Sequence, residues 1–270
     1  MGEEFEEFDE EVEEKLEYRE RRYEVEQRMK QKRSEEYEVL EEVFDKPTLM
    51  TIYHLMNRGV IDKLYGAVAA GKESRVYWGV SRDGKDLAVK IFLIVSAEFR
   101  KGMLTYIEGD PRFTLVKKST RALIYTWASK EFKNLQRAYE AGVRVPKPIA
   151  IRNNVLVMEF IGEEGVPAPL VRDIELPKPK AVYEDVLENV KKLYQKAELV
   201  HGDLSEYNLM FWRGRAYMFD MSQAVSVQHP RAQEFLKRDI HNISRFFEKL
   251  GVRIRPVERV FRWIVSDVRD

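Results

Sequence analysis

The sequence predicts an α+β fold in two lobes: an N-terminal lobe built on an antiparallel sheet with a helix, and a mainly helical C-terminal lobe. Short apolar segments separated by turn residues occupy 65–92 and 155–161 and are typical of strands. Apolar residues at helical spacing recur in four further segments, 120–141, 181–197, 230–251 and 256–268. Between these helices the stretch 199–225 contains two short apolar segments edged by polar residues.

Composition narrows the class of protein. With 44% hydrophobic residues, the 270-residue chain can bury a sizeable core. Cysteine is absent, which excludes disulfides and thiolate metal sites. Lys+Arg and Asp+Glu both number 46, so overall charge does not argue for nucleic-acid binding. No apolar run approaches the roughly 18 residues of a membrane helix. We expect a soluble, cytoplasmic protein without a membrane partner, and the oligomeric state is left open.

The chain divides into three predicted regions. Residues 1–46 are rich in Glu and poor in apolar residues, which predicts a charged helical or disordered extension, or an acidic arm that contacts a partner. Residues 47–161 form the N-terminal lobe, and residues 162–270 form the C-terminal lobe. A helix is expected to open near Pro47 with Asp45 as its cap.

The N-terminal lobe is read as strands, turns and one long helix. Residues 65–80 predict strand, glycine turn and strand, and Asp83-Gly84 predicts the hairpin turn into a third strand at 87–92. Residues 95–119 are charged and read as a loop, which at this length is mobile or functional. The helix at 120–141 ends at Gly142, 145–150 is extended, 155–161 is a buried strand, and 162–179 is a linker.

The stretch after the helix at 181–197 has the spacing of a phosphoryl-transfer site. Asp203 and Asn208 are five residues apart, Asp220 follows twelve later, and His201 precedes them. Asp203 is the candidate catalytic base that orients the attacking oxygen. Asn208 and Asp220 supply the oxygen ligands that suit Mg²⁺, for which Mn²⁺ is a substitute. His201 is expected to hold the loop by hydrogen bonds.

A lysine and a glutamate complete this pattern. Lys90 lies on the apolar strand at 87–92, where a lysine alone most often faces solvent from an edge. In a phosphoryl-transfer enzyme the same lysine reaches the α- and β-phosphates of ATP and pairs with a carboxylate of the next helix. Glu131 is the predicted partner, and Glu140, nearer the end of that helix, is the alternative.

Two segments are candidates for holding the rest of ATP. Gly71-Lys72-Glu73-Ser74 matches neither of the common glycine-rich phosphate loops, but it precedes Lys90 at a suitable distance, so Lys72 and Ser74 are predicted to hold the triphosphate. The strand end at Met158, Glu159 and Ile161 is the predicted hinge, with backbone groups of Glu159 and Ile161 bonding adenine.

These motifs resemble the RIO-type atypical serine/threonine protein kinases, most closely the archaeal form of the Rio-one subfamily, over roughly 47–251. The resemblance is carried by two stretches, 199–208 and 220–225, together with His229-Pro230, Gly71-Lys72-Glu73 and Met158-Glu159-Phe160-Ile161-Gly162. Ala69-Ala70 and Ser74-Arg75 depart from the usual Rio-one residues around the Gly-Lys-Glu, and the Gly-Lys-Glu-Ser form is closer to Rio-two.

The resemblance implies a bilobal protein-kinase-like fold lacking the activation loop and the peptide-binding subdomains. It implies ATP with Mg²⁺, autophosphorylation on serine, and a role in maturing the small ribosomal subunit, with its rRNA and ribosomal proteins as partners. It also implies that Asp220 can itself accept the phosphoryl group in an ATPase cycle. The family's mobile loop would match 95–119, with the modified serine near Ser119.

Two other functions stay open at this point. Small-molecule phosphotransferases of the aminoglycoside or choline kinase type also use His-Gly-Asp-x-x-x-x-Asn, although the longer acidic substrate region that they usually carry is missing here. A non-catalytic assembly factor that binds ATP and docks on a ribosomal precursor is the third hypothesis. Candidate RNA contacts are Lys117-Lys118 with Arg121, and Arg253 with Arg255.

Overall fold

The computed structural model describes residues 44–93, 97–108, 110, 112 and 119–266. It forms two units, residues 1–50 and 51–270, and each is described by itself. In the first unit the N-terminus of helix α2 (Lys46–Asn57) is capped by Asp45, whose Oδ1 accepts a hydrogen bond from the Thr48 N–H at 3.1 Å. The predicted cap is therefore confirmed. Most of the predicted charged extension lies outside the described residues.

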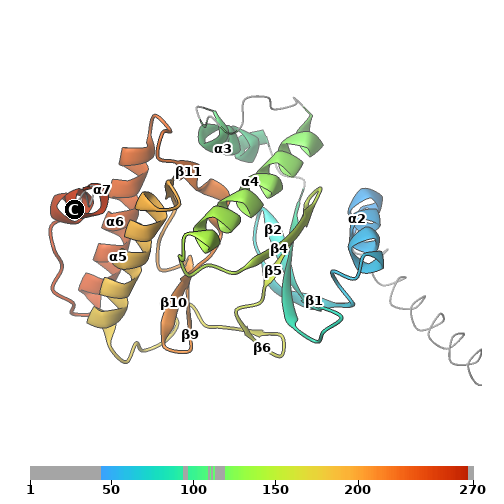
Figure 1. Cartoon of the computed structure of the whole chain (residues 1–270), viewed down its shortest axis with the longest axis horizontal. Helices are drawn as coiled ribbons and strands as arrows, with labels where there is room; N and C mark the ends of the chain where they lie inside the picture. The colour runs from blue at the N-terminus through green and yellow to red at the C-terminus, as the bar shows by residue number, and fades with distance from the viewer. Residues whose placement is uncertain (1–43, 94–96, 109, 111, 113–118, 267–270) are drawn as a thin grey trace, which may run out of the picture. The chain divides into compact units, whose positions relative to one another are not determined.

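The second unit begins with a five-stranded antiparallel sheet in the order β1-β2-β3-β5-β4 (Figure 1). Its strands are β1 (Lys63–Ala70), β2 (Ser74–Val80), β3 (Asp86–Phe92), β4 (Pro148–Arg152) and β5 (Val155–Glu159). Strand β3 is central, and from Leu87 to Phe92 all its residues are buried. Lys90 therefore lies in the middle of the sheet, opposite Val76 and Leu156, and not at an edge.

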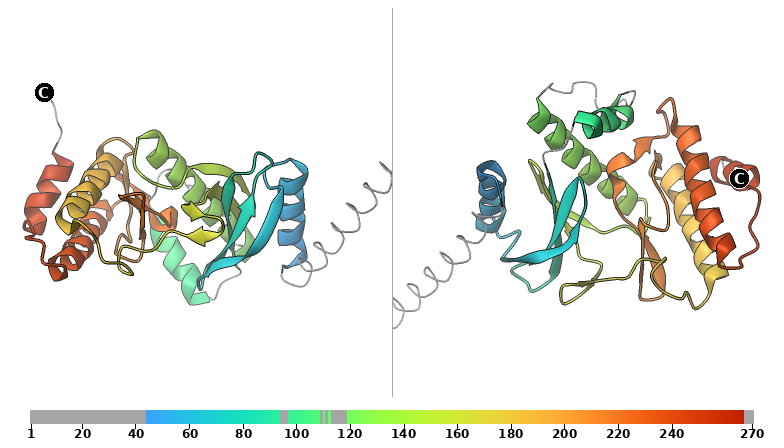
Figure 2. Two further views of the ribbon diagram at one scale, coloured as in Figure 1. Left: turned by 90° about the horizontal axis from the view of Figure 1, so that it is seen from below. Right: turned by 180° about the vertical axis from the view of Figure 1, so that it is seen from behind.

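Helix α4 (Thr120–Glu140) packs against strands β4 and β5. Its N-terminus is capped by the Ser119 side chain, which accepts from the Ala122 N–H at 3.2 Å. Gly142 ends the helix as predicted, with a φ of 74° that favours glycine. Figures 1 and 2 show α4 between the sheet and the helices of the C-terminal lobe.

The prediction of a continuous loop over 95–119 is wrong for part of that segment. Helix α3 (Ala97–Ile107) occupies it and packs on α4. Met103 and Ile107, one helical turn apart, are 2% and 1% exposed and form the apolar face that stabilises the helix. Charged residues around this short face concealed its period. Residues 113–118 lie outside the described part of the chain.

Three helices build the C-terminal lobe: α5 (Pro179–Gln195), α6 (Ala232–Lys249) and α7 (Val257–Val265). The stretch 199–226 forms two small antiparallel pairs, β8 (Leu199–Val200) with β11 (Val225–Ser226), and β9 (Leu209–Trp212) with β10 (Arg215–Met218). The predicted linker contains a short hairpin of β6 (Gly162–Glu163) and β7 (Val166–Pro167), which the glycine and proline content did not reveal.

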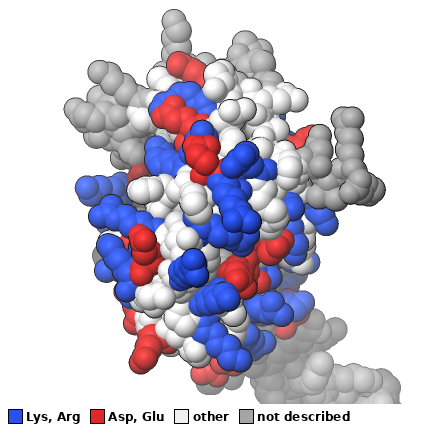
Figure 3. Space-filling view, turned by 90° about the vertical axis from the view of Figure 1, so that its left-hand side faces the viewer, with Lys and Arg blue, Asp and Glu red and all other residues white. Residues whose placement is uncertain are grey.

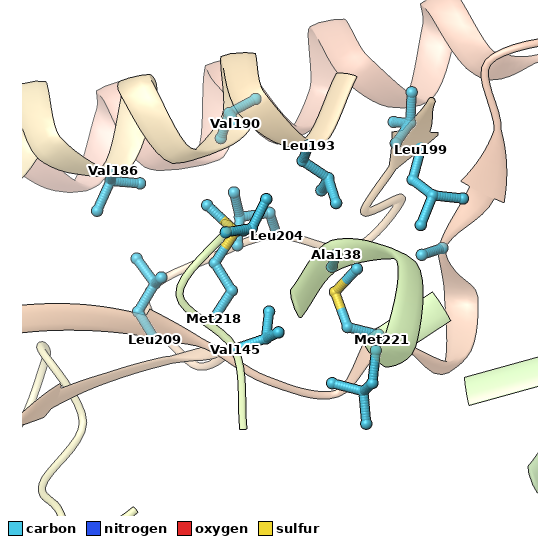
Figure 4. Packing of buried hydrophobic residues seen from close by; sticks show 14 of the residues in the cluster. Ala138, Val145, Val186, Val190, Leu193, Leu199, Leu204, Leu209, Met218 and Met221 are labelled. Carbon is cyan, nitrogen blue, oxygen red and sulfur yellow. The ribbon is translucent and has the colours of Figure 1, made fainter. Parts of the chain in front are cut away.

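Apolar side chains fix the polar stretch to the core (Figure 4). Val186, Val190 and Leu193 of α5 point toward Leu204, Leu209 and Met218. Met221 packs near Ala138 of α4. Because these apolar residues alternate along the chain with His201, Asp203, Asn208 and Asp220, burying them also positions the polar side chains.

Within the described residues, no helix is both long and apolar enough to cross a membrane.

Burial predicts a large difference between two leucine truncations. Leu187 is fully buried in α5, whereas Leu250 after α6 is 42% exposed. We expect Leu187→Ala to lower the free energy of unfolding by about 2–5 kcal/mol. Leu250→Ala should lower it by less than about 1 kcal/mol. Urea denaturation measures both, and equal losses would contradict the placement of the core under α5.

Candidate active site

The catalytic loop, residues 201–208 between β8 and β9, is held by hydrogen bonds to helix α6. The Asp239 carboxylate accepts hydrogen bonds from the backbone N–H groups of Gly202 and Leu204 at 2.8 and 2.9 Å. Gly202 has a φ of 81°, and a Cβ there would lie 3.0 Å from the carbonyl oxygen of Gln223. The loop is thus fixed by a buried aspartate that the sequence motifs did not single out.

Asp203 projects from this loop into the open site. Asn208 Nδ2 donates to the Asp203 carbonyl at 2.7 Å, and Gln223 Nε2 lies 3.2 Å from a carboxylate oxygen of Asp203. Partial burial, together with the negative charge of Asp220, raises the pKa of Asp203 above its ordinary value. A carboxylate with a raised pKa, held by its backbone and open to solvent, has the properties of a general base.

Asp220 follows β10 in the left-handed conformation, with a φ of 57°. Its Oδ1 accepts from Lys90 Nζ at 2.9 Å and from the Ser222 hydroxyl at 2.8 Å. Burial alone would raise the pKa of Asp220, but the Lys90 ammonium outweighs it and holds the pKa below its usual value. Asp220 is therefore ionised at neutral pH.

Lys90 joins three separate elements of the chain. Its Nζ contacts both carboxylate oxygens of Glu131 on α4, at 2.7 and 2.9 Å, in addition to Asp220. Burial alone would lower the pKa of Lys90, but the two carboxylates outweigh it and raise the pKa. The geometry pairs Lys90 with Glu131 as predicted, while the alternative, Glu140, is exposed at the end of α4.

His201 links the two loops of the site. Its Nε2 lies 3.1 Å from the carbonyl oxygen of Phe219, the residue before Asp220. Burial lowers the pKa of His201 to about 4, so the ring is neutral at pH 7 and we assign its proton to Nε2. This hydrogen bond agrees with the predicted structural role of His201.

A buried clamp, Lys130 and Asn134 of α4, holds the turn after Asp220. Lys130 Nζ donates to the carbonyl oxygens of Ser222, at 3.0 Å, and Ala224. Asn134 Nδ2 donates to those of Met221 and Ala224 at 2.8 and 2.9 Å. Neither side chain was predicted, because their partners are backbone groups about 90 residues away. The residue pattern of α4 does offer one signal, a lysine and an asparagine on its apolar face.

The phosphate-loop candidates occupy the turn between β1 and β2. Gly71 N–H donates to Ser74 carbonyl at 2.9 Å, which closes the turn, and Lys72 is exposed while Ser74 is half-buried. Glu73, which was not among the predicted site residues, lies close enough to Asp220, Glu131 and Asp203 to feel their negative charge. Burial and then the charge of Asp220 raise the pKa of Glu73 to about 7. The turn thus adds a carboxyl group to the site, where the sequence indicated only a lysine and a hydroxyl.

The predicted hinge includes the last two residues of β5 and the residues that follow them. Met158, Phe160 and Ile161 are buried, whereas Glu159 is exposed. The Glu159 N–H donates to the Lys147 carbonyl at 2.8 Å, and the Ile161 carbonyl accepts from Ala168 at 2.8 Å. These two backbone groups are therefore engaged within the chain. The Ile161 N–H has no backbone partner among the described residues.

A groove of 690 Å³ adjoins this hinge. It is lined by Glu159, Phe160, Trp212 and the turn between β2 and β3. It contains none of the predicted phosphate or metal residues, so it is distinct from the site around Lys90.

The donor set fits a divalent cation that also takes oxygen ligands from a bound phosphate. The described residues contain no cluster of three or more His, Cys, Asp or Glu that could hold a metal by itself. Asn208 and Asp220 offer an amide oxygen and a carboxylate oxygen. Two protein oxygens completed by phosphates and water are typical of Mg²⁺ sites.

A strand lysine paired with a helix glutamate, a loop with Asp and Asn, and a second Asp define a protein-kinase-like phosphoryl-transfer centre. The fold agrees: the Rio2 kinase of Chaetomium thermophilum superposes with a TM-score of 0.64 at 24% identity, covering 82% of this chain and 69% of that one. A second structure of that kinase gives a TM-score of 0.63 at 22% identity, covering 82% of this chain and 67% of that one.

Sequence comparison then identifies the family. Residues 75–260 match the RIO domain. The RIO-type serine/threonine-protein kinase Rio1 of Haloferax volcanii is 44% identical over 83% of this chain and 77% of its own length. The corresponding values for Rio1 of Methanocaldococcus jannaschii are 43%, 81% and 74%. Human RIO1 is 37% identical over 84% of this chain but only 40% of its own length. The chain belongs to the RIO family of serine/threonine-protein kinases, and the predicted resemblance to archaeal Rio-one enzymes is confirmed.

The buried histidine predicts a pH-dependent stability. An unfolded histidine has a pKa of about 6.5, and His201 in the folded chain has one of about 4. The unfolded state then binds more protons between these values, so stability is lost as the pH falls from 6.5 to 4. The loss is about 3 kcal/mol.

Urea denaturation between pH 7 and 4 measures this loss. His201→Gln should remove this part of the pH dependence, while the exposed His241→Gln should behave as wild type. If wild type and His201→Gln lose stability in parallel, His201 does not titrate as described.

Proposed function

We propose that this kinase transfers the γ-phosphoryl group of ATP to serine, including its own serine, and to Asp220 in an ATPase cycle, during maturation of the small ribosomal subunit. The observation that carries the proposal is Lys90, which contacts Glu131 and Asp220 at once. In this arrangement Lys90 binds the α- and β-phosphates, and Lys72 and Ser74 hold the rest of the triphosphate.

The hinge segment would receive the adenine. Met158 would contact the adenine ring, and the Ile161 N–H would donate to it. The Glu159 N–H and the Ile161 carbonyl are excluded from this role because both are bonded within the chain. The backbone contact predicted for Glu159 would then be made by its carbonyl oxygen, which accepts a hydrogen bond from adenine.

Asp203 acts as base in the transfer to serine. The serine oxygen attacks the γ-phosphorus. The bond between the γ-phosphorus and the β,γ-bridging oxygen breaks, ADP leaves with that oxygen, and Asp203 receives the hydroxyl proton. The side-chain amide of Asn208 donates a hydrogen bond to the Asp203 carbonyl. This bond keeps Asp203 at a fixed distance from the Asn208 side chain, the proposed metal ligand. Asn208 and Asp220 would hold Mg²⁺, which when bound would neutralise charge on the phosphates.

Asp220 is the second acceptor. Its Oδ1 is held by Lys90 and Ser222, while Oδ2 has no hydrogen bond to a described residue. Oδ2 attacks the γ-phosphorus, ADP leaves, and water then hydrolyses the acyl phosphate to inorganic phosphate and the free carboxylate. The Chaetomium thermophilum Rio2 kinase was solved as an ADP/Mg²⁺-phosphoaspartate complex, which supports this route by analogy.

The serine acceptor within the chain is proposed near Ser119. Its side chain is exposed, and its hydroxyl caps α4.

The ribosomal role, with rRNA and ribosomal proteins as partners, rests on the family alone. The alternative of a small-molecule phosphotransferase is tested by a panel of aminoglycosides and amino alcohols as phosphoryl acceptors.

Two substitutions separate the two acceptors. With ³²P-labelled ATP and Mg²⁺, Asp203→Asn should lower labelling of serine by at least about a hundredfold, because the base is lost. Asp220→Asn should abolish the hydroxylamine-sensitive label, because an acyl phosphate can no longer form. Asp173→Asn, an exposed aspartate in an ion pair with Arg172, is the matched control and should change neither.

If Asp203→Asn labels like wild type, and wild type releases no phosphate, the proposed function is wrong. If the hydroxylamine-sensitive label survives Asp220→Asn, the acceptor is another carboxylate.

The clamp predicts a positioning effect on catalysis. Lys130→Met keeps the aliphatic chain but leaves the Ser222 carbonyl without the donor that it has now. Loosening the turn after Asp220 should lower kcat about tenfold, equivalent to one buried hydrogen bond, and should change KM for ATP much less. Lys133→Met, exposed on the same helix, is the control. Loss of stability with kcat unchanged, measured well below the melting temperature, would limit Lys130 to a structural role.

A further inference from the structure

The balanced charge of the whole chain conceals a strongly basic body. Residues 1–43 contain 18 acidic and eight basic residues, so the rest of the chain has a net charge of +10. This excess of positive charge lies on the part of the protein that carries the described fold. Polyanions are the partners that such a body attracts.

Helix α7 gives part of this charge a fixed scaffold. Val260 and Ile264 are fully buried, and the helix packs on α5 and α6. The Gln195 amide of α5 donates to the carbonyl oxygens of Ile264 and Ser266 at 2.9 and 2.8 Å, which holds the C-terminal end of α7. The outer face of α7 is therefore rigidly attached to the lobe.

That outer face and its neighbours are rich in cations, and we call them the α7 basic surface. The surface consists of Lys191, Lys237, Arg253, Arg255, Arg259 and Arg262. Figure 3 views the molecule from the side of α5, α6 and α7, where Lys and Arg outnumber Asp and Glu. Residues 252–266 contain one acidic residue, Glu258, and it pairs with Lys237 at 3.0 Å. Arg253, Arg255 and Arg259 form no ion pair with any described residue.

Aromatic rings lie among these cations. Lys191 Nζ is 4.4 Å from the ring centre of Trp263, and the Arg255 guanidinium is 5.6 Å from it. Lys237 Nζ is 4.8 Å from the ring of Phe261. Both rings are partly exposed. The rings hold the cations in place, which reduces the entropy lost when a ligand binds.

We propose that the α7 basic surface binds the phosphodiester backbone of RNA. Guanidinium groups match phosphate by two parallel hydrogen bonds, and partly exposed rings between them can stack on bases. An acidic protein segment would use the charges but not the rings, so the chemistry favours RNA. Helix α6 contacts the catalytic loop through Arg238 and Asp239, and α7 through Lys237. RNA on α7 therefore leaves the ATP site open.

This inference deepens the proposed ribosomal role, and its test measures binding alone, so that its failure is distinguishable from a failure of phosphoryl transfer. The full chain is titrated into a fluorescein-labelled 20-nucleotide oligouridylate without ATP, and fluorescence anisotropy gives Kd at several KCl concentrations. The test variant is R253Q/R255Q/R259Q. The matched control, R58Q/R82Q/R213Q, removes three exposed arginines from other elements.

The test variant should raise Kd at least tenfold at 100 mM KCl. For a single strand, each phosphate contact contributes about 0.7 to the slope of the logarithm of the association constant against log [KCl]. Loss of three contacts should therefore make this slope less negative by about 2. The control should change Kd less than threefold. R253K/R255K/R259K keeps the charges and should keep most of the slope. Unchanged autophosphorylation checks that each variant is folded.

Three results would overturn the proposal. The first is a test variant with the Kd and slope of wild type. The second is an equal loss in the control, which would show attraction by net charge only. In the third, a synthetic peptide of residues 1–43 binds the body and depends on the same arginines while the RNA does not bind. The surface would then belong to an acidic protein segment.

Discussion

The site depends on one buried ammonium group. Lys90 comes from the centre of the sheet, Glu131 from the long helix behind it, and Asp220 from the turn after β10, and the three meet within hydrogen-bond distance. Lys90 and Glu131 are buried, and their close contact offsets the unfavourable removal of these two charges from water. Loss of Lys90 would leave the carboxylates of Glu131 and Asp220 facing each other without a cation between them. The interaction thus holds the sheet, helix α4 and the turn that carries Asp220 in one arrangement.

Backbone anchors extend this arrangement to the rest of the site. Asp239 of α6 holds the loop of Asp203, and the clamp of Lys130 and Asn134 on α4 holds the turn of Asp220. His201 joins the two loops through the carbonyl of Phe219. The functional side chains can therefore lie in an open, polar site and still be held firmly, because the groups that position them are buried. The α7 surface, on a different side of α6, is free to serve another role.

Residue order and spacing were enough to predict which side chains meet at the site, but not the groups that support them. Lys90, Glu131 and Asp220 were recognised because each type of residue has one place in the kinase order of motifs. Helix α3 was missed because its apolar face is short and surrounded by charge. Lys130, Asn134 and Asp239 were missed because their partners are backbone groups distant in sequence, for which side-chain patterns give no signal. The hinge is predicted at the end of β5, but which of its backbone groups are engaged depends on contacts with Lys147 and Ala168 that no local pattern reveals.

The most direct test of this account is a crystal structure with a non-hydrolysable ATP analogue and Mn²⁺, in which anomalous scattering locates the metal. The account predicts Mn²⁺ bound by Asn208 and Asp220, with the α- and β-phosphates against Lys90 and the γ-phosphate between Asp203 and Asp220. A nucleotide bound elsewhere, for example in the groove beside Trp212, or a metal held without Asp220, would contradict it.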